Sequence, residues 1–155
     1  MSPSAWYSTF LTSIALRLHP VVPRNEREAI RDTVLPLGGG KDGFSPIFVP
    51  KGTLVSYSLY ALHRRADFYG PDAENFRPER WEEGSLQPPW GYLPFNGGPR
   101  ICIGQQYALT EVGYVLVRMA QEFQVLESRD TGAWEESLAL TLCSRNGTKV
   151  CLTPA

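Results

Sequence analysis

Cys102 lies in a glycine-containing loop immediately before the most regular apolar segment of the chain. Beyond Gly104, apolar residues recur every three or four positions: Leu109, Val112, Leu116, Met119, Ala120 and Phe123. This spacing predicts a helix, and a helix that is apolar so far around is expected to be largely buried. The fold must therefore accommodate a long helix with a cysteine loop at its amino end.

The residues around Cys102 favour a particular chemistry. Its sulfur would face the positive end of the helix, where backbone N–H groups stabilise a thiolate. Arg100 adds positive charge, and Gly98 and Gly104 allow a flat, bulky group to approach the backbone. A thiolate that ligates haem iron needs these features, with a cation for a haem propionate. The alternative for a lone cysteine is a free buried thiol.

The segment 95–104, FNGGPRICIG, resembles the haem-binding signature of the cytochrome P-450 monooxygenases, Phe-x-x-Gly-x-Arg-x-Cys-x-Gly. The match holds at all five fixed positions: Phe95, Gly98, Arg100, Cys102 and Gly104. Residues 76–81 (FRPERW) resemble the meander of that family, and residues 17–20 (RLHP) resemble the end of its K helix. The segments 35–40 (LPLGGG) and 46–52 (PIFVPKG) are most similar to fungal n-alkane and fatty-acid hydroxylases.

This resemblance implies the cofactor site. Haem b would be held through the Cys102 thiolate, within the motif formed by Phe95, Gly98, Arg100 and Gly104. Residues 23–27 (PRNER) resemble the strand behind the haem, so Arg27 and Arg100 are expected to contact the propionates. Without the family, Arg27 is interpreted as part of a solvated basic strand edge.

The expected fold is α+β, mainly α, corresponding to the C-terminal third of the cytochrome P-450 fold. We expect a helix ending near Leu18, a small sheet between residues 21 and 59, one or two helical turns over 60–69, and the long helix after Gly104. Residues 138–152 predict a hairpin around Asn146-Gly147 that pairs 143 with 150 and 142 with 151. Its register would put Cys143 and Cys151 on opposite faces and disfavours a disulfide between them.

One position departs from the family. The K helix of the family carries Glu-x-x-Arg, and Ile14 occupies the glutamate position three residues before Arg17. Arg17 and Arg80 are the expected structural network that locks the meander, and without the glutamate they would lose their shared carboxylate. An uncompensated buried charge of this kind costs about 3–5 kcal/mol. Residues 1–155 are interpreted as one partial domain, with residues 1–13 outside the family sequence.

The implied reaction inserts one oxygen atom into a C–H bond of an aliphatic substrate, an alkane or a fatty acid. Electrons would come from NADPH through a flavoprotein reductase that docks near the Cys102 loop. Expected substrate contacts, carried over by position, are Val21, Val22, Pro23, Ser144 and Arg145. The alternative is a truncated, non-catalytic remnant that binds no haem, and the short chain alone is expected to be inactive.

Composition restricts the other functional classes. The chain has 155 residues and a formal net charge of −1, so no overall basic footprint for nucleic acid is present and no nucleic-acid partner is expected. No apolar run approaches the roughly 18 residues that a membrane span needs. We expect the parent enzyme at the cytosolic face of the endoplasmic reticulum membrane, and this chain, which lacks the anchor, in the cytoplasm. Three cysteines argue against a disulfide scaffold.

Overall fold

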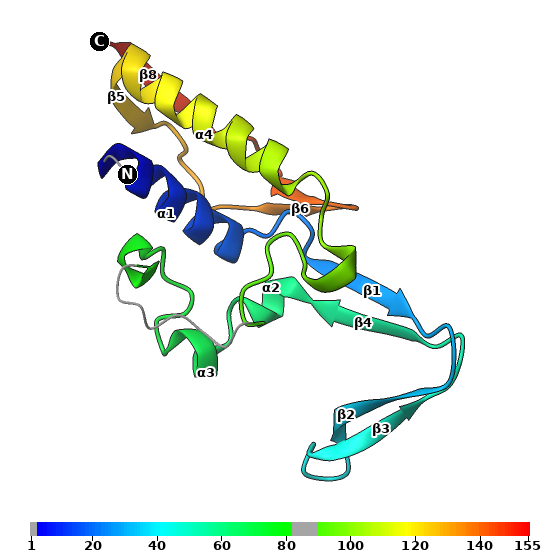
Figure 1. Ribbon diagram of the computed structural model, residues 1–155. Coiled ribbons are helices and arrows are strands. Elements are labelled where there is room, and N and C mark those ends of the chain that lie inside the picture. Colours follow the sequence, from blue (N-terminus) through cyan, green and yellow to red (C-terminus); the bar gives the residue numbers. More distant parts are fainter. Residues whose placement is uncertain (1–2, 82–89) are drawn as a thin grey trace. The chain divides into compact units, whose positions relative to one another are not determined.

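The structure, a computed structural model, describes residues 3–81 and 90–155 (Figure 1). Its helices are α1 (Pro3–Leu18), α2 (Leu59–Leu62), α3 (Ala66–Tyr69) and α4 (Gln105–Glu122), with the 3-10 turns η1 (Pro78–Trp81) and η2 (Gly98–Arg100). Its strands are β1 (Arg24–Glu28), β2 (Thr33–Gly39), β3 (Ser45–Val49), β4 (Leu54–Ser58), β5 (Phe123–Ser128), β6 (Glu136–Leu138), β7 (Leu142–Ser144) and β8 (Val150–Pro154). The chain divides into two compact units, one of residues 1–23 and 59–155, the other of residues 24–58.

The unit of residues 24–58 contains two antiparallel strand pairs. Strand β1 pairs with β4, and β2 pairs with β3 through a register shift between Leu35 and Gly39. Turn residues separate short β-branched segments here, which is why the region forms strands. The strands expected between residues 21 and 59 are therefore present, as two antiparallel pairs instead of one small sheet.

Helix α1 ends at Leu18, where the sequence predicts, because the residue before Pro20 avoids the helical backbone conformation. One face of α1 is buried and contains Ile14, Arg17 and Leu18. This face packs against η1, and α1 also contacts α4. The buried face of α1 is the largest part of a small core, which otherwise includes Leu59 and residues near the meander.

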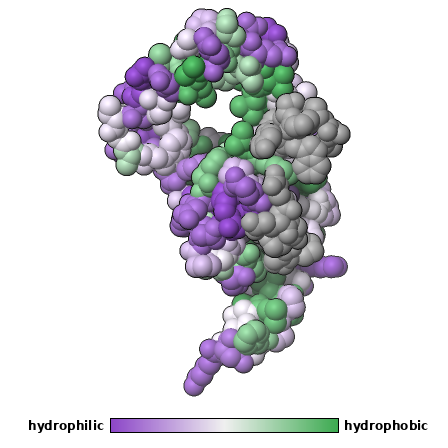
Figure 2. Space-filling view, turned by 90° about the vertical axis from the view of Figure 1, so that its left-hand side faces the viewer, coloured by the Kyte–Doolittle hydropathy of each residue, from purple (hydrophilic) through white to green (hydrophobic). Residues whose placement is uncertain are grey.

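Helix α4 starts after Gly104, as predicted, but the prediction that it is largely buried is wrong. None of its residues is buried: within its apolar stripe, Val112 is 41% exposed and Leu109, Leu116 and Met119 are only half-buried. The helix packs mainly on α1 and β5, and neither covers the whole stripe. Figure 2 shows apolar residues (green) open to the surface beside polar ones, and several of them border an opening in the upper part of the view.

The predicted C-terminal hairpin is also wrong in its pairing. Gly147 does adopt the left-handed conformation of a turn, with φ of 71°. However, β7 pairs with β6, so that Cys143 lies opposite Ser137, and β8 pairs with β5, so that Cys151 lies opposite Glu127. The local turn signal is real, but each flanking strand finds a different partner, because strand pairing depends on which apolar faces meet. Both cysteines are free thiols.

The mixed helix and strand content agrees with the α+β class. The expectation of a mainly α structure overstates the helical share in the described residues, where eight strands accompany only two helices longer than one turn. Each sheet in the described residues consists of two antiparallel strands.

Candidate functional site

The loop before α4 has a defined backbone geometry. Gly98 has φ of 72°, a conformation that L-residues rarely adopt, and it opens the turn η2. The N–H of Ile101 donates to the carbonyl of Gly98 at 3.1 Å. The N–H of Cys102 donates to the carbonyl of Phe95 at 2.9 Å. These bonds close the loop into a compact bend, with Phe95 at its base and Cys102 at its outer end.

Cys102 lies directly before the amino end of α4, and its residue is exposed. Gly104 precedes the first helical residue, and a Cβ placed there would lie 3.8 Å from the Cys102 sulfur. A methyl group at position 104 would therefore be in van der Waals contact with the sulfur. The aligned peptide dipoles of α4 give this end a partial positive charge that favours an anionic ligand atom.

This geometry fits a haem, the group that the motif implies. The thiol is exposed, it stands at a helix amino end, and a Cβ added at Gly98 would meet nothing within 4 Å. The backbone at Gly98 therefore faces open space, so a flat group can approach it closely. Arg100, which is also exposed, lies two residues before the sulfur.

The segment leading into the loop is fixed from three directions. The Tyr69 hydroxyl donates to the carbonyl of Gly91 at 3.0 Å. The Tyr92 hydroxyl donates to the carbonyl of Ser13 in α1 at 3.1 Å. The N–H of Leu93 donates to Nε2 of a buried histidine at 2.8 Å. This histidine is His63, which follows α2.

Burial changes the acidity of these groups. It raises the pKa of Tyr69 to about 12, although the nearby Arg17 and Arg80 guanidiniums oppose the change. Burial also raises the pKa of Tyr92. Both phenols therefore remain protonated and can donate their hydrogen bonds at neutral pH.

Arg17 and Arg80 are both buried and both contact the segment around Tyr69. Arg17 donates to the backbone carbonyls of His63 at 2.8 Å, Ala73 at 2.6 Å and Asn75 at 3.1 Å. Its guanidinium carbon lies 4.8 Å from the centre of the Tyr69 ring. Burial, and next the charge of Arg80, lower the pKa of Arg17. Three carbonyl dipoles thus solvate the Arg17 charge in place of a carboxylate.

Arg17 and Arg80 share no carboxylate in the described residues, as expected, but the expectation that the charge of Arg80 is uncompensated is wrong. Arg80 donates from Nη2 to the Asp72 carboxylate at 2.8 Å and from Nη1 to the carbonyl of Tyr69 at 2.6 Å. Hydrogen bonding to Arg80 lowers the pKa of Asp72. The buried position of Ile14, next to Arg17, is thus compatible with charge compensation from elsewhere.

The other predicted site residues fall into two groups. Arg27 belongs to the unit of residues 24–58, where it donates to Asn25 Oδ1 at 3.1 Å and lies 5.8 Å from the centre of the Tyr57 ring. The predicted substrate residues belong to the other unit, where the carbonyl of Val21 accepts the N–H of Leu142 at 2.8 Å. This bond joins the segment 21–23 to β7, the strand that ends at Ser144.

Within that second group, Val21 and Val22 are exposed and Pro23 is half-buried. Ser144 turns its hydroxyl to the carbonyl of Gly147 at 2.7 Å. Arg145 lies 3.6 Å from the Glu135 carboxylate. The structure therefore places residues 21–23 close to β7. The side chains of Ser144 and Arg145, by contrast, contact Gly147 and Glu135 in the C-terminal part of the chain.

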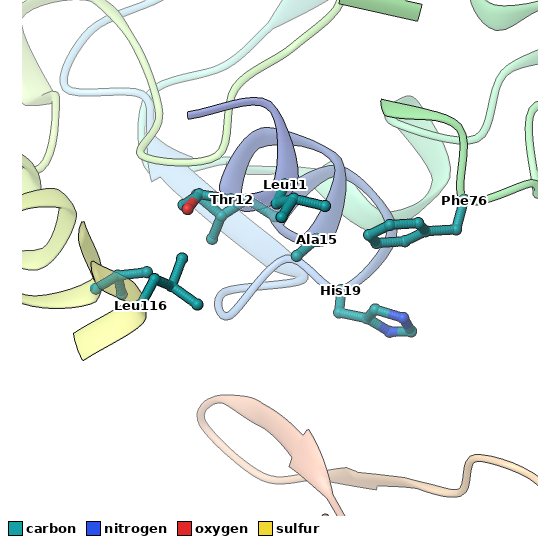
Figure 3. A pocket seen from close by; sticks show the side chains of 8 residues that line it. Leu11, Thr12, Ala15, His19, Phe76 and Leu116 are labelled. Carbon is teal, nitrogen blue, oxygen red and sulfur yellow. The ribbon is translucent and has the colours of Figure 1, made fainter. Parts of the chain in front are cut away.

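An apolar groove of about 410 Å³ lies between α1 and α4. Figure 3 shows Leu11, Thr12 and Ala15 of α1 and His19, the residue after α1, around it. Phe76 and Leu116 of α4 lie on opposite sides. The His19 ring also contacts the Trp134 ring at a tilt of 51°, with ring centres 4.7 Å apart. Burial lowers the pKa of His19, so its imidazole is more readily neutral in this apolar surrounding.

The described residues contain no group of three or more metal-ligating side chains of the His, Cys, Asp or Glu type. No helix in the described residues is long and apolar enough to span a membrane.

Comparison with known proteins decides the family. The family model described as Cytochrome P450 matches residues 15–152, which is most of the chain. The chain belongs to the cytochrome P450 family. The resemblance inferred from the motifs is confirmed, and the family implies a haem cofactor and, in general, a redox partner reductase.

The most similar cytochrome P450 relatives include several fungal proteins. The chain is 56% identical to the cytochrome P450 monooxygenase himC of Aspergillus japonicus over 96% of its length, and 60% identical to fsdH of Fusarium heterosporum over 94%. It is 65% identical to cytochrome P450 52A3-A of Candida maltosa over 74% of its length. The chain spans about a quarter of these relatives, 26%, 26% and 22% respectively.

Sequence reasoning missed one residue that is bonded to the segment before the cysteine loop. His63 is interpreted from the sequence as a single histidine without a metal partner, because no second ligand stands at helical spacing. In the structure it is fully buried and bonded to the segment before the cysteine loop. The available signal is its place among the apolar residues after Leu59, which predicts burial but not the identity of the partner.

Proposed function

We propose that the chain supplies the thiolate-ligand region of a haem monooxygenase, with Cys102 as the ligand of a haem b iron. The observation that carries this proposal is the exposed Cys102 thiol at the amino end of an 18-residue helix, between Gly98 and Gly104. When bound, the haem would supply the oxidative chemistry that inserts one atom of O2 into a C–H bond.

The residues of the chain would bind and orient that group. Cys102 would present an anionic sulfur, held in place by the bond from its N–H to the Phe95 carbonyl. Gly98 and Gly104 would leave room for the flat macrocycle. Arg100 would pair with a propionate through charge-assisted hydrogen bonds, and the family resemblance alone gives the same role to Arg27.

Partners and substrate rest on the family resemblance. A flavoprotein reductase using NADPH would deliver electrons at the face near Cys102, and the parent enzyme would lie at the cytosolic face of the endoplasmic reticulum. The substrate would be an alkane or a fatty acid. Val21, Val22 and Pro23 would contact its aliphatic part, with Ser144 and Arg145 nearby. The exposed apolar side chains at 21 and 22 support this choice.

A haem titration tests the ligand assignment. The wild-type chain is expected to give a thiolate-type absorption spectrum that is lost in the Cys102→Ala variant. Cys143→Ala is the matched control, because Cys143 is also an exposed free thiol. An unchanged spectrum in Cys102→Ala, or its loss in Cys143→Ala, would contradict the assignment.

A second candidate is a non-catalytic remnant that binds no haem. The exposed apolar stripe of α4 favours it, because an uncovered stripe weakens the element that carries the cysteine loop. In that case the wild-type chain gives no thiolate-type spectrum at any haem concentration. The same titration therefore separates the two candidates.

A further inference from the structure

His63 is fully buried and has a direct polar contact with the segment that enters the cysteine loop. Its relative exposure is 0%, and its Nε2 accepts the N–H of Leu93 at 2.8 Å. The two residues are 30 positions apart in the chain. This bond therefore joins the end of α2 to the loop that follows the meander.

Leu93 transmits this restraint toward Cys102. The carbonyl of Leu93 accepts the N–H of Asn96 at 3.2 Å, which closes a turn. Within that turn, the carbonyl of Phe95 accepts the N–H of Cys102 at 2.9 Å. His63 thus holds one end of a short hydrogen-bonded turn, and the residue that bears the sulfur is held by the same turn.

His63 itself is held firmly. Its backbone carbonyl accepts a hydrogen bond from Arg17 Nη1 at 2.8 Å. Its ring lies against Tyr92, with centres 5.3 Å apart, and the Tyr92 hydroxyl is bonded to Ser13 in α1. His63 is therefore positioned by one direct bond to α1 and by Tyr92, which is itself bonded to α1, the helix that also packs against α4.

The bond requires a neutral imidazole, because a protonated ring has no free lone pair to accept an N–H. Burial lowers the pKa of His63 to about 4. The charges of Arg17 and Arg64 act in the same direction, whereas the backbone of Arg17 and Leu16 opposes it. The acceptor is consequently available throughout the neutral range.

We propose that His63 is a positioning residue that fixes the Cys102 loop through Leu93. Its importance for iron ligation rests on the proposed function, whereas its effect on the loop does not. Because the restraint acts through the backbone, it sets where the sulfur lies without contacting the sulfur.

The test compares three variants of the chain by amide hydrogen exchange followed by NMR. His63→Leu keeps the volume and removes the acceptor, whereas His63→Gln offers a side-chain oxygen as a replacement acceptor. His19→Leu is the matched control, because His19 is the other histidine of the chain and contacts Trp134 instead. Amides of the β5–β8 ladder serve as the internal reference for global unfolding.

In His63→Leu, exchange at the Leu93 and Cys102 amides is expected to rise about tenfold, the effect of losing one buried hydrogen bond. It should stay close to wild type in His63→Gln and His19→Leu, with the reference amides unchanged. Unchanged exchange at Leu93 and Cys102 in a folded His63→Leu variant would overturn the proposal. So would an equal rise in His63→Gln.

If His63→Leu unfolds the whole chain, amide exchange of the wild-type chain at decreasing pH tests the proposal instead. As the pH falls through about 4, the Leu93 amide, corrected for its intrinsic exchange rate, must lose protection before the β5–β8 ladder does. Simultaneous loss overturns the proposal.

A haem titration of the same proteins separates the two proposals. Without a thiolate-type spectrum in the wild type, the proposed function fails while the exchange result still stands.

Discussion

Arg17 donates from Nη1 to the backbone carbonyl of His63 at 2.8 Å, and both side chains have no exposed surface. The bond joins the last turn of α1 to the end of α2. Through Leu93, His63 continues this connection to the loop that carries Cys102. The buried arginine and the thiol are thus parts of one hydrogen-bonded framework, although they lie 85 positions apart in the sequence.

Replacing Arg17 with methionine is expected to lower the free energy of unfolding by about 3 kcal/mol or more. The variant leaves the carbonyls of His63, Ala73 and Asn75 without the donor that now satisfies them. Urea denaturation followed by circular dichroism measures the change. Arg118→Met is the control, since Arg118 makes an exposed i,i+4 pair with Glu122 that contributes less than about 1 kcal/mol. Equal losses in the two variants would contradict the prediction.

A glutamate at position 14 is expected to be tolerated. Ile14 is fully buried one helical turn before Arg17, and Arg17 Nε is a buried donor without a hydrogen-bond partner in the described residues. Ile14→Glu should change the unfolding free energy by no more than about 2 kcal/mol, since a well-placed buried ion pair roughly breaks even against an apolar side chain. Ile14→Lys should cost clearly more, because it adds a third cation beside Arg17 and Arg80.

A double-mutant cycle checks this pairing. In the Arg17→Met background, Ile14→Glu should cost at least about 2 kcal/mol more than in the wild type, because the carboxylate is then buried without a partner. A coupling energy near zero would show that the carboxylate does not meet Arg17.

The features predicted correctly from the sequence are the local ones. The start of the helix after Gly104 and the end of α1 before Pro20 follow from neighbouring residues alone. The partners of β7 and β8 do not follow from neighbouring residues. Asn146-Gly147 specifies a turn, but it does not specify which strands the residues before and after it join. Long-range pairing is decided by packing.

In the candidate site, too, the local features could be predicted from the sequence and the long-range contacts could not. The motif around Cys102 is contiguous, so its loop could be predicted as a unit. The carboxylate partner of Arg80 is Asp72, which belongs to no motif that we identified, and the contact forms only when η1 folds back on the residues after α3. The role of His63 depends on a residue 30 positions away, which no local pattern indicates.

Stability is expected to fall as the pH decreases from about 6.5 to about 4. The pKa of His63 is lowered to about 4 in the folded chain, so the unfolded chain takes up the proton first, and the difference contributes about 3 kcal/mol. This contribution is complete above about pH 6.5, is lost through the window, and does not change further below it. Urea denaturation at graded pH measures the slope. The slope should decrease more in His63→Leu than in His19→Leu, because burial lowers the pKa of His19 in the same direction but by less. An identical slope in both variants would assign it to other groups.

Gly97 is expected to tolerate no side chain while Trp90 is present. A Cβ at position 97 would lie 2.6 Å from Trp90 Cζ3 and 3.2 Å from Leu93 Cδ2, although the backbone of Gly97 is extended and unstrained. Gly97→Ala should therefore cost about 1–3 kcal/mol through steric overlap alone. Thermal unfolding monitored by circular dichroism measures it.

The matched control for this substitution is Gly113→Ala, in the middle of α4, where an added Cβ meets nothing within 4 Å. There, alanine should stabilise the chain by about 0.5–1 kcal/mol, because it lowers the entropy of the unfolded chain and favours the helix. In a Trp90→Ala background, most of the cost of Gly97→Ala should disappear, because the ring that it meets is gone. A cost that persists without Trp90 would place the conflict at Leu93, the residue that His63 holds in position.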